Sequence, residues 1–194
     1  MGLDSYWHIR KTTYEFGWKS DGEEALKKVL GKYPKEVRDI NRKTGGCPAL
    51  GPSISREETY EIGYFRKFDA MHRWVIKHCA DGKDDCQDIV VPDERLDELI
   101  NACMEVLLAS VAAKAPAEGL SEEEAKERLE ETVREYLPPT PGVSDEGYLK
   151  KASELLELLR GAKKALEKLR AKAEASYGKT GNRETWELVY EASW

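Results

Sequence analysis

Both ends of the chain carry strand-forming segments, and this feature constrains the fold more than any other. Residues 3–16 place apolar and aromatic side chains among polar ones, a content that favours a β-strand. Residues 185–194 alternate in the same way and are rich in Trp, Val and Tyr. Because free chain ends need to be tied down, we expect the last strand to pair with the first within one sheet.

Further strands and several helices are expected between these ends. Residues 58–64 and 87–91 have strand patterns, and Gly63 indicates a bulge or a close backbone approach. Periodicity and end signals predict helices over residues 65–80, 93–113, 121–137 and 144–177, with two shorter ones in 21–40. The sequence therefore predicts an α+β fold, with a small antiparallel sheet of N-terminal, central and C-terminal strands packed by helices.

At 194 residues the chain is expected to form a single domain, residues 1–194, with a helical hairpin annex at residues 117–177. The last long helix has a narrow apolar seam made of Leu155, Leu158, Leu159, Ala162, Ala165, Leu166 and Leu169. Such a seam packs on another helix. Its partner is either residues 94–113 of the same chain, or a second copy or a host protein, and both alternatives stay open.

Composition excludes some classes of function. A net charge of −6 argues against a general nucleic-acid binder, which normally has a basic surplus on one face. The chain has no apolar run near the ~20 residues that span a bilayer and no signal-peptide pattern, so we expect a cytoplasmic protein without membrane contact. Its four cysteines are expected to be free thiols, and no cofactor is expected.

The richest group of ligand-binding side chains lies at residues 64–78. Arg66, Arg73 and Lys77 fall close to one face of the predicted helix 65–80. Arg binds phosphate or carboxylate in a bidentate fork, and aromatic rings stack on bases. We therefore expect an anionic, nucleotide-like ligand, bound by Tyr64, Arg66, Lys67, His72, Arg73 and Trp74. The competing interpretation is that His72 and its apolar neighbours belong to the core, while the basic side chains are only solvated.

Three other groups offer weaker alternatives. Asp81, Asp84 and Asp85 are possible metal ligands, but their spacing matches no calcium-binding loop, and they also suit a turn before the next strand. A small hydrolase would need a Cys-His-Asp set, either His78 with Cys79 and Cys86, or His72 with Cys86 and Asp85. The Gly- and Pro-rich residues 44–52 offer backbone amides to a phosphate but lack the P-loop pattern.

Several short motifs, in order and spacing, resemble those of a family of proteins common in bacteriophage genomes. They are Met1-Gly2-Leu3-Asp4, residues 61–67 with Gly63-Tyr64-Phe65-Arg66-Lys67, His72-x-Trp74, Asp84-Asp85-Cys86-Gln87, Leu137-Pro138-Pro139-Thr140 and the terminal Ser193-Trp194. The chain departs from that family where Pro141-Gly142-Val143-Ser144 replaces a Gly-Phe-Phe-Phe-Gly stretch. The resemblance implies an accessory protein that acts in a host cytoplasm by binding a host factor or capturing a host defence signal.

Overall fold

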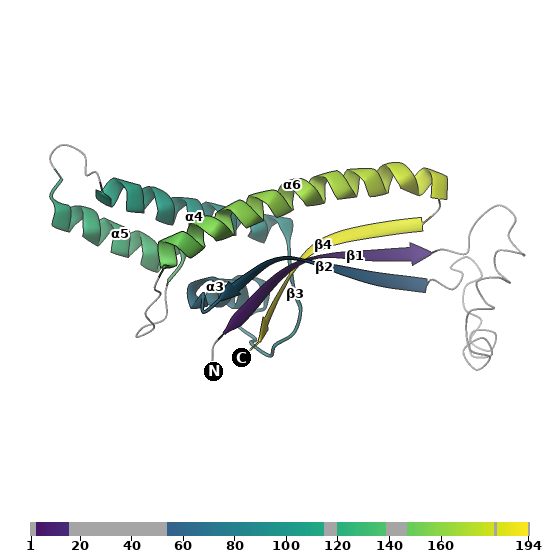
Figure 1. Ribbon diagram of the computed structural model, residues 1–194, viewed down its shortest axis with the longest axis horizontal. Coiled ribbons are helices and arrows are strands. Elements are labelled where there is room, and N and C mark those ends of the chain that lie inside the picture. The colour runs from purple at the N-terminus through teal and green to yellow at the C-terminus, as the bar shows by residue number, and fades with distance from the viewer. Residues whose placement is uncertain (1–2, 16–53, 115–119, 139–146, 181, 194) are drawn as a thin grey trace, which may run out of the picture. The chain divides into compact units, whose positions relative to one another are not determined.

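The computed structural model describes residues 3–15, 54–114, 120–138, 147–180 and 182–193 (Figure 1). Within them the strands are β1 (Asp4–Glu15), β2 (Ile54–Arg66), β3 (Ile89–Val91) and β4 (Asn182–Ser193), and the helices are α3 (Asp69–Cys79), α4 (Asp93–Lys114), α5 (Glu122–Tyr136) and α6 (Tyr148–Thr180). The predicted α+β fold with an antiparallel sheet is confirmed. The helices expected at residues 21–40 and the loop at 44–52 lie outside the described residues.

The strands form one sheet in the order β2-β1-β4-β3. The first and last strands of the chain are therefore neighbours at its centre, as the strand patterns at the two chain ends predicted. β3 pairs with β4 in antiparallel fashion, with Ile89 opposite Tyr190 and Val91 opposite Leu188. These paired side chains lie on the same face of the sheet, because residues directly opposite each other in a ladder point the same way.

The expected start of the helix at residue 65 is wrong, because residues 65 and 66 still belong to β2. The period of two continues to the end of that strand: Phe65 is buried, whereas Tyr64 and Arg66 are exposed. The chain then turns at Lys67, which has a positive φ of 52° and donates its backbone N–H to the carbonyl of Leu3 at 2.7 Å. Arg66 is consequently a strand residue and does not share a helix face with Arg73.

Contacts divide the chain into two compact units. The first contains Met1–Ile9, Thr59–Leu166 and Glu187–Trp194, and the second contains Arg10–Glu58 and Glu167–Trp186. In the first unit the core is aromatic: Trp7 meets the ring of Tyr190 edge-on at 5.1 Å and donates its indole N–H to the sulfur of Met71 on α3. Phe68, which precedes α3, and Val75 of α3 are fully buried in the same unit. The single-domain expectation stays a prediction.

The helices of the first unit pack on one another and on β2. α5 begins with the capping box expected at Ser121 and packs against α4. α6 contacts α4 through an ion pair between Lys163 and Asp97. Residues of the apolar seam, including Leu155, Leu159 and Leu166, are buried within this chain. This supports the alternative in which the seam packs intramolecularly, because buried side chains are not open to a partner.

Gly63 confirms the close backbone approach expected from the sequence. A Cβ atom built on this residue would overlap the Cδ1 atom of Leu158 on α6. The absence of a side chain at Gly63 therefore allows the helix to lie directly on the strand.

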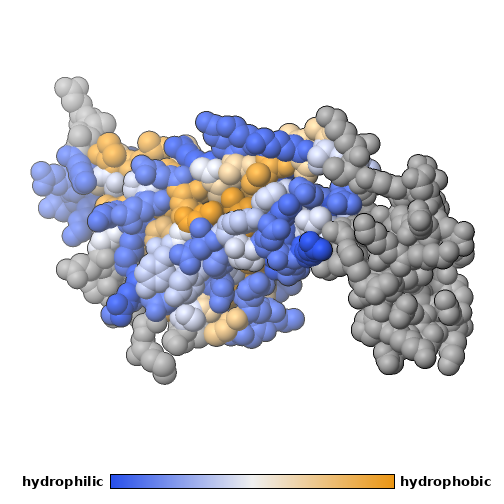
Figure 2. All heavy atoms as spheres, turned by 45° about the vertical axis from the view of Figure 1, so that its right-hand side comes forward, coloured by the Kyte–Doolittle hydropathy of each residue, from blue (hydrophilic) through white to orange (hydrophobic). Residues whose placement is uncertain are grey.

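Polar side chains cover much of the surface, with hydrophobic residues gathered between them in the view of Figure 2. In the first unit the exposed large apolar side chains include Tyr60, Ile62 and Tyr64 of β2, and Leu108 and Val111 of α4. No helix in the described part of the chain has both the length and the apolar character needed to cross a membrane.

Candidate functional site

Helix α3 positions the side chains of the candidate site. Its inner face buries Ala70, Met71, His72, Trp74 and Val75, and its outer face exposes Arg73 and Lys77. Asp69 lies in the first turn and Lys77 in the last, where a carboxylate and a cation each oppose the partial charge of the helix end. Asp69, Arg73 and Lys77 recur at four-residue steps, so they lie along one stripe of the helix.

A buried chain of hydrogen bonds connects this helix to the sheet. His72 is 2% exposed. Its Nδ1 atom lies 2.8 Å from the hydroxyl oxygen of Tyr190, and its Nε2 atom lies 3.1 Å from Oδ2 of Asp84. The Tyr190 hydroxyl in turn donates to Oγ of Ser5 at 3.0 Å. Four side chains from β1, α3, the following loop and β4 are thereby joined.

Tyr190 remains a neutral phenol in this chain. Burial raises the pKa of Tyr190, and the negative charges of Asp84 and Asp69 raise it further, while the hydrogen bond to Ser5 acts in the opposite direction. The phenolate would be a charge in an apolar surrounding with two carboxylates nearby, which is why the proton is retained. Tyr190 therefore acts in this structure as a hydrogen-bonding group.

The loop that follows α3 forms the second wall of the site. Two successive residues, Asp81 and Gly82, have positive φ values of 51° and 78°, and the N–H of Gly82 donates back to the carbonyl of Ile76 at 2.9 Å. A left-handed turn at the C-terminal end of a helix is common, although a Gly usually occupies it. This reversal returns the chain toward the helix and places Asp84 against His72.

Helix and loop together border an open, shallow hollow of about 460 Å³. It is lined by Asp69, His72, Arg73, Ile76, Lys77, Asp81, Gly82 and Asp84. Within the described residues, Arg73 and Lys77 have no hydrogen bond or ion pair, so both cations are available to a ligand. The Oδ2 atom of Asp69 is buried and lacks a hydrogen-bond donor in the same part of the chain. The hollow therefore offers two cations that are unpaired within the described residues.

The six side chains that the sequence grouped into one ligand site occupy different places. His72 and Arg73 line the hollow. Tyr64 instead donates to Oδ1 of Asp4 at 2.7 Å, and Arg66 lies 3.9 Å from the same oxygen. The Lys67 carbonyl accepts from Lys151 at 2.9 Å, and none of these three side chains lines the hollow.

Trp74 is likewise separate from the hollow. It is 6% exposed and stacks on His78 with ring centroids 4.4 Å apart. Base stacking on this ring, which the sequence interpretation assumed, thus has no surface on which to occur. Whether the six residues bind a ligand stays a prediction. Of these six, only His72 and Arg73 line the hollow, together with Lys77 and the carboxylates of Asp69, Asp81 and Asp84.

The arrangement does not favour the alternative with a cysteine nucleophile. Burial raises the pKa of Cys79 to about 11 and that of Cys103 to about 12, so neither forms a thiolate near neutral pH. Cys86 is exposed and has no side-chain hydrogen bond to any described residue. Burial also lowers the pKa of His78, with the positive charges of Lys77 and Arg95 adding to the effect. Across the described ranges, no three His, Cys, Asp or Glu side chains are placed to hold a metal ion.

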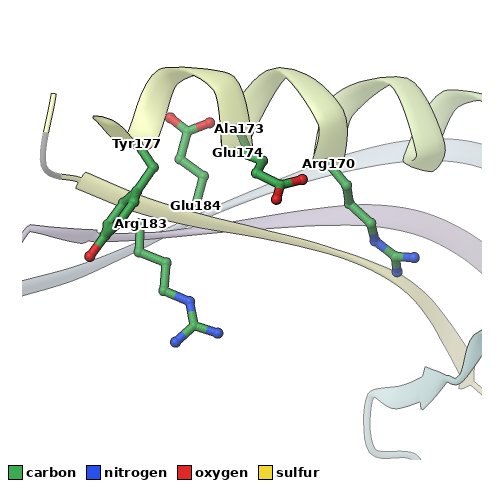
Figure 3. A pocket seen from close by; sticks show the side chains of 6 residues that line it. All are labelled: Arg170, Ala173, Glu174, Tyr177, Arg183 and Glu184. Carbon is green, nitrogen blue, oxygen red and sulfur yellow. The ribbon is translucent and has the colours of Figure 1, made fainter. Parts of the chain in front are cut away.

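The second unit has a hollow of its own, of about 440 Å³, between the end of α6 and the start of β4. Figure 3 shows Arg170, Glu174 and Tyr177 extending from the helix, and Arg183 and Glu184 from the strand. Two of these charged groups are already engaged: Arg170 donates to the carbonyl of Trp186 at 3.0 Å, and Glu184 pairs with Lys11 at 2.9 Å. The hollow beside α3 is therefore the better candidate, because its two cations have no partner among the described residues.

Recognition in the hollow beside α3 depends on two kinds of group. Arg73 and Lys77 suit an anion such as phosphate. Asp69 and Asp81 suit hydroxyl or amino donors. Because the lining carries three carboxylates and two cations, net charge alone would not draw in an anion. No protein-family model, curated protein or solved structure matches this chain, so the interpretation of the hollow rests on its own residues.

Proposed function

We propose that this protein binds, without chemical turnover, a small ligand that carries both a phosphate-like anion and hydroxyl groups, as a nucleotide or a sugar phosphate does. The observation that supports this most is the shared hollow beside α3. In it, Arg73 and Lys77 are one helical turn apart, exposed and unpaired within the described residues, and carboxylates lie beside them. Its volume, about 460 Å³, is within the usual range of small-ligand sites.

The two ends of such a ligand have separate partners. A guanidinium group binds phosphate oxygens through two parallel N–H donors, and a neighbouring ammonium adds a second charge. Sugar hydroxyls donate to carboxylates, and Asp69, Asp81 and Asp84 line the hollow.

The polar network favours binding over catalysis. His72 would be the obvious general base, but it is 2% exposed and both its ring nitrogens already have partners in Asp84 and Tyr190. A general base must be within hydrogen-bond reach of the proton that it takes. The role of His72 in this proposal is to hold the loop that carries Asp81 and Asp84 against α3.

The proposal also limits what part of a nucleotide is recognised. Ile76 is the apolar side chain in the lining, and Trp74 is buried elsewhere. No Phe, Tyr or Trp is among the described residues that line the hollow, so phosphate and sugar contribute most of the affinity. Nucleotides that differ only in their base should therefore bind with similar affinity.

Isothermal titration calorimetry with linear and cyclic nucleotides and with sugar phosphates tests the proposal. Arg73→Ala and Lys77→Ala should each weaken binding about tenfold or more, because each loses a charge-assisted hydrogen bond. Lys126→Ala removes an exposed cation from α5 and should leave the affinity unchanged. Arg66→Ala distinguishes the ligand site expected from the sequence, which includes Arg66, from the hollow, which does not. It should weaken binding only if the site expected from the sequence is the real one. A panel without saturable binding, or an effect of Lys126→Ala equal to that of Arg73→Ala, would contradict the proposal.

The resemblance to bacteriophage proteins extends this proposal to its biological purpose. A protein that binds a phosphorylated signal molecule without turning it over lowers the free concentration of that molecule. Sequestration of a host defence signal in the host cytoplasm is thus the role that we propose for such binding. Release of unaltered ligand after heat denaturation of the loaded protein, followed by chromatography, would distinguish sequestration from turnover.

A further inference from the structure

Strand β2 is an edge of the sheet with an unusually open surface. It lies at one end of the order β2-β1-β4-β3, so among the described strands only β1 pairs with it. Every residue from 56 to 62 is exposed, which means that both faces of the strand are open there. Tyr60, Ile62 and Tyr64 are 47%, 36% and 48% exposed and share one face, since they are two residues apart.

The backbone of this edge is oriented for further pairing. Lys67 donates its N–H to the carbonyl of Leu3 on the β1 side. Backbone groups alternate between the two sides of a strand, so counting back by twos directs those of Phe65 and Gly63 toward β1. The N–H and C=O groups of Ile62 and Tyr64 then point to the free edge. An edge of this kind is a template for another strand.

We propose that the occupant of this edge is β2 of a second copy of the chain, paired antiparallel about a two-fold axis at Ile62. In that register, residues whose numbers sum to 124 lie opposite each other. Ile62 lies opposite Ile62 of the second copy. Tyr60 lies opposite Tyr64 and Glu58 opposite Arg66, and by symmetry each of these two pairs occurs twice in the dimer. The two sheets join into one continuous sheet with an aromatic and aliphatic stripe across the interface.

The charge pattern of the strand selects this register. Glu57 and Glu58 precede the centre, whereas Arg66 and Lys67 follow it at matching distances. Acids therefore oppose bases when two copies pair about Ile62. A shift of the axis to Glu61 would place Arg56 opposite Arg66, and like charges directly opposite destabilise a ladder. A shift of the axis to Gly63 would place Arg66 opposite Tyr60. Arg66 would then lose Glu58 as its acidic partner.

Arg66 is free to make the proposed contact. Its side chain is 69% exposed, and its one acidic contact among the described residues, to Asp4, is long at 3.9 Å. Asp4 keeps the hydroxyl of Tyr64 as a partner at 2.7 Å if Arg66 moves away. Pairing through Arg66 therefore leaves Asp4 with a hydrogen-bond donor.

Sedimentation velocity over a range of protein concentrations tests the proposal. The native chain should show a monomer–dimer equilibrium. Arg66→Glu should weaken the dimer about tenfold or more, because two ion pairs become two like-charge pairs. The double variant Glu58→Arg, Arg66→Glu should restore the native dissociation constant. In it the acid and the base of each ion pair have changed places, so opposite charges face each other again. Ile62→Lys should also produce a monomer, because it places two ammonium groups at the axis.

Lys126→Glu is the matched control, with the same change of charge at an exposed site on α5. Circular dichroism of each variant establishes that it is folded. The proposal is overturned if the native chain is a monomer at every concentration, if Lys126→Glu weakens the dimer as much as Arg66→Glu does, or if the double variant does not restore it. Ligand binding by monomeric Ile62→Lys, measured separately, keeps this proposal distinct from the one on the hollow.

Discussion

At the scale of single residues, His72 and Tyr190 show how a buried polar pair organises the candidate site. The sequence placed His72 among apolar positions, and it is indeed buried in the first unit. Its partner Tyr190 is 118 residues away along the chain. Nothing in the local pattern of either residue indicates the other, because the hydrogen bond depends on β4 returning to the centre of the sheet.

Tyr190→Phe tests how much the hydrogen bond between His72 and Tyr190 contributes to stability. The change removes one hydroxyl and leaves Nδ1 of His72 and Oγ of Ser5 without that partner in a buried place, which typically costs about 1–3 kcal/mol of stability. Urea unfolding followed by circular dichroism measures the loss. Tyr177→Phe is the control, because Tyr177 is 52% exposed and its change should lie within about 0.5 kcal/mol of the native value. Equal effects of the two changes would contradict a structural role for the network.

At the scale of elements, the contact between β2 and α6 depends on one missing side chain. Gly63→Val should destabilise the protein by about 1–3 kcal/mol, because its Cβ would overlap Leu158 and force the strand and the helix apart. Leu158→Ala in the same chain should recover part of this loss, and a double-mutant cycle on unfolding free energies measures the coupling.

Gly161 of α6 provides the opposite control for that contact. A Cβ on Gly161 meets no atom within 4 Å, so Gly161→Ala should stabilise the helix by about 0.5–1 kcal/mol. If Gly63→Val proved as harmless as Gly161→Ala, the close approach of α6 to β2 would be contradicted.

At the scale of the whole molecule, the sheet requires its last strand. β4 lies between β1 and β3 and supplies Leu188 and Tyr190 to the core. A chain that ends at Gly181 would leave β1 with β2 as its only neighbour among the described strands and β3 with none, and should lose cooperative thermal unfolding. Circular dichroism and amide-proton NMR dispersion would detect this, and a truncated chain that still unfolds in one sharp transition would refute it.

The sequence by itself determined the classes and approximate positions of the described elements, because periodicity and capping are local properties. The strand patterns at both ends, the capping box at Ser121 and the close approach at Gly63 were all readable in this way. The start of α3 was not, since Phe65 and Arg66 fit both a helical and an alternating period, and the ladder with β1 decided between them.

Only the tertiary structure decided which side chains meet. It separated Tyr64 and Arg66 from Arg73, buried Trp74 against His78, and brought Asp84 and Tyr190 to the two sides of His72. The physical reason is that these contacts join positions far apart in the chain, so they depend on strand order and on the direction in which each loop turns. Local sequence patterns specify elements, whereas the packing of elements against one another specifies sites.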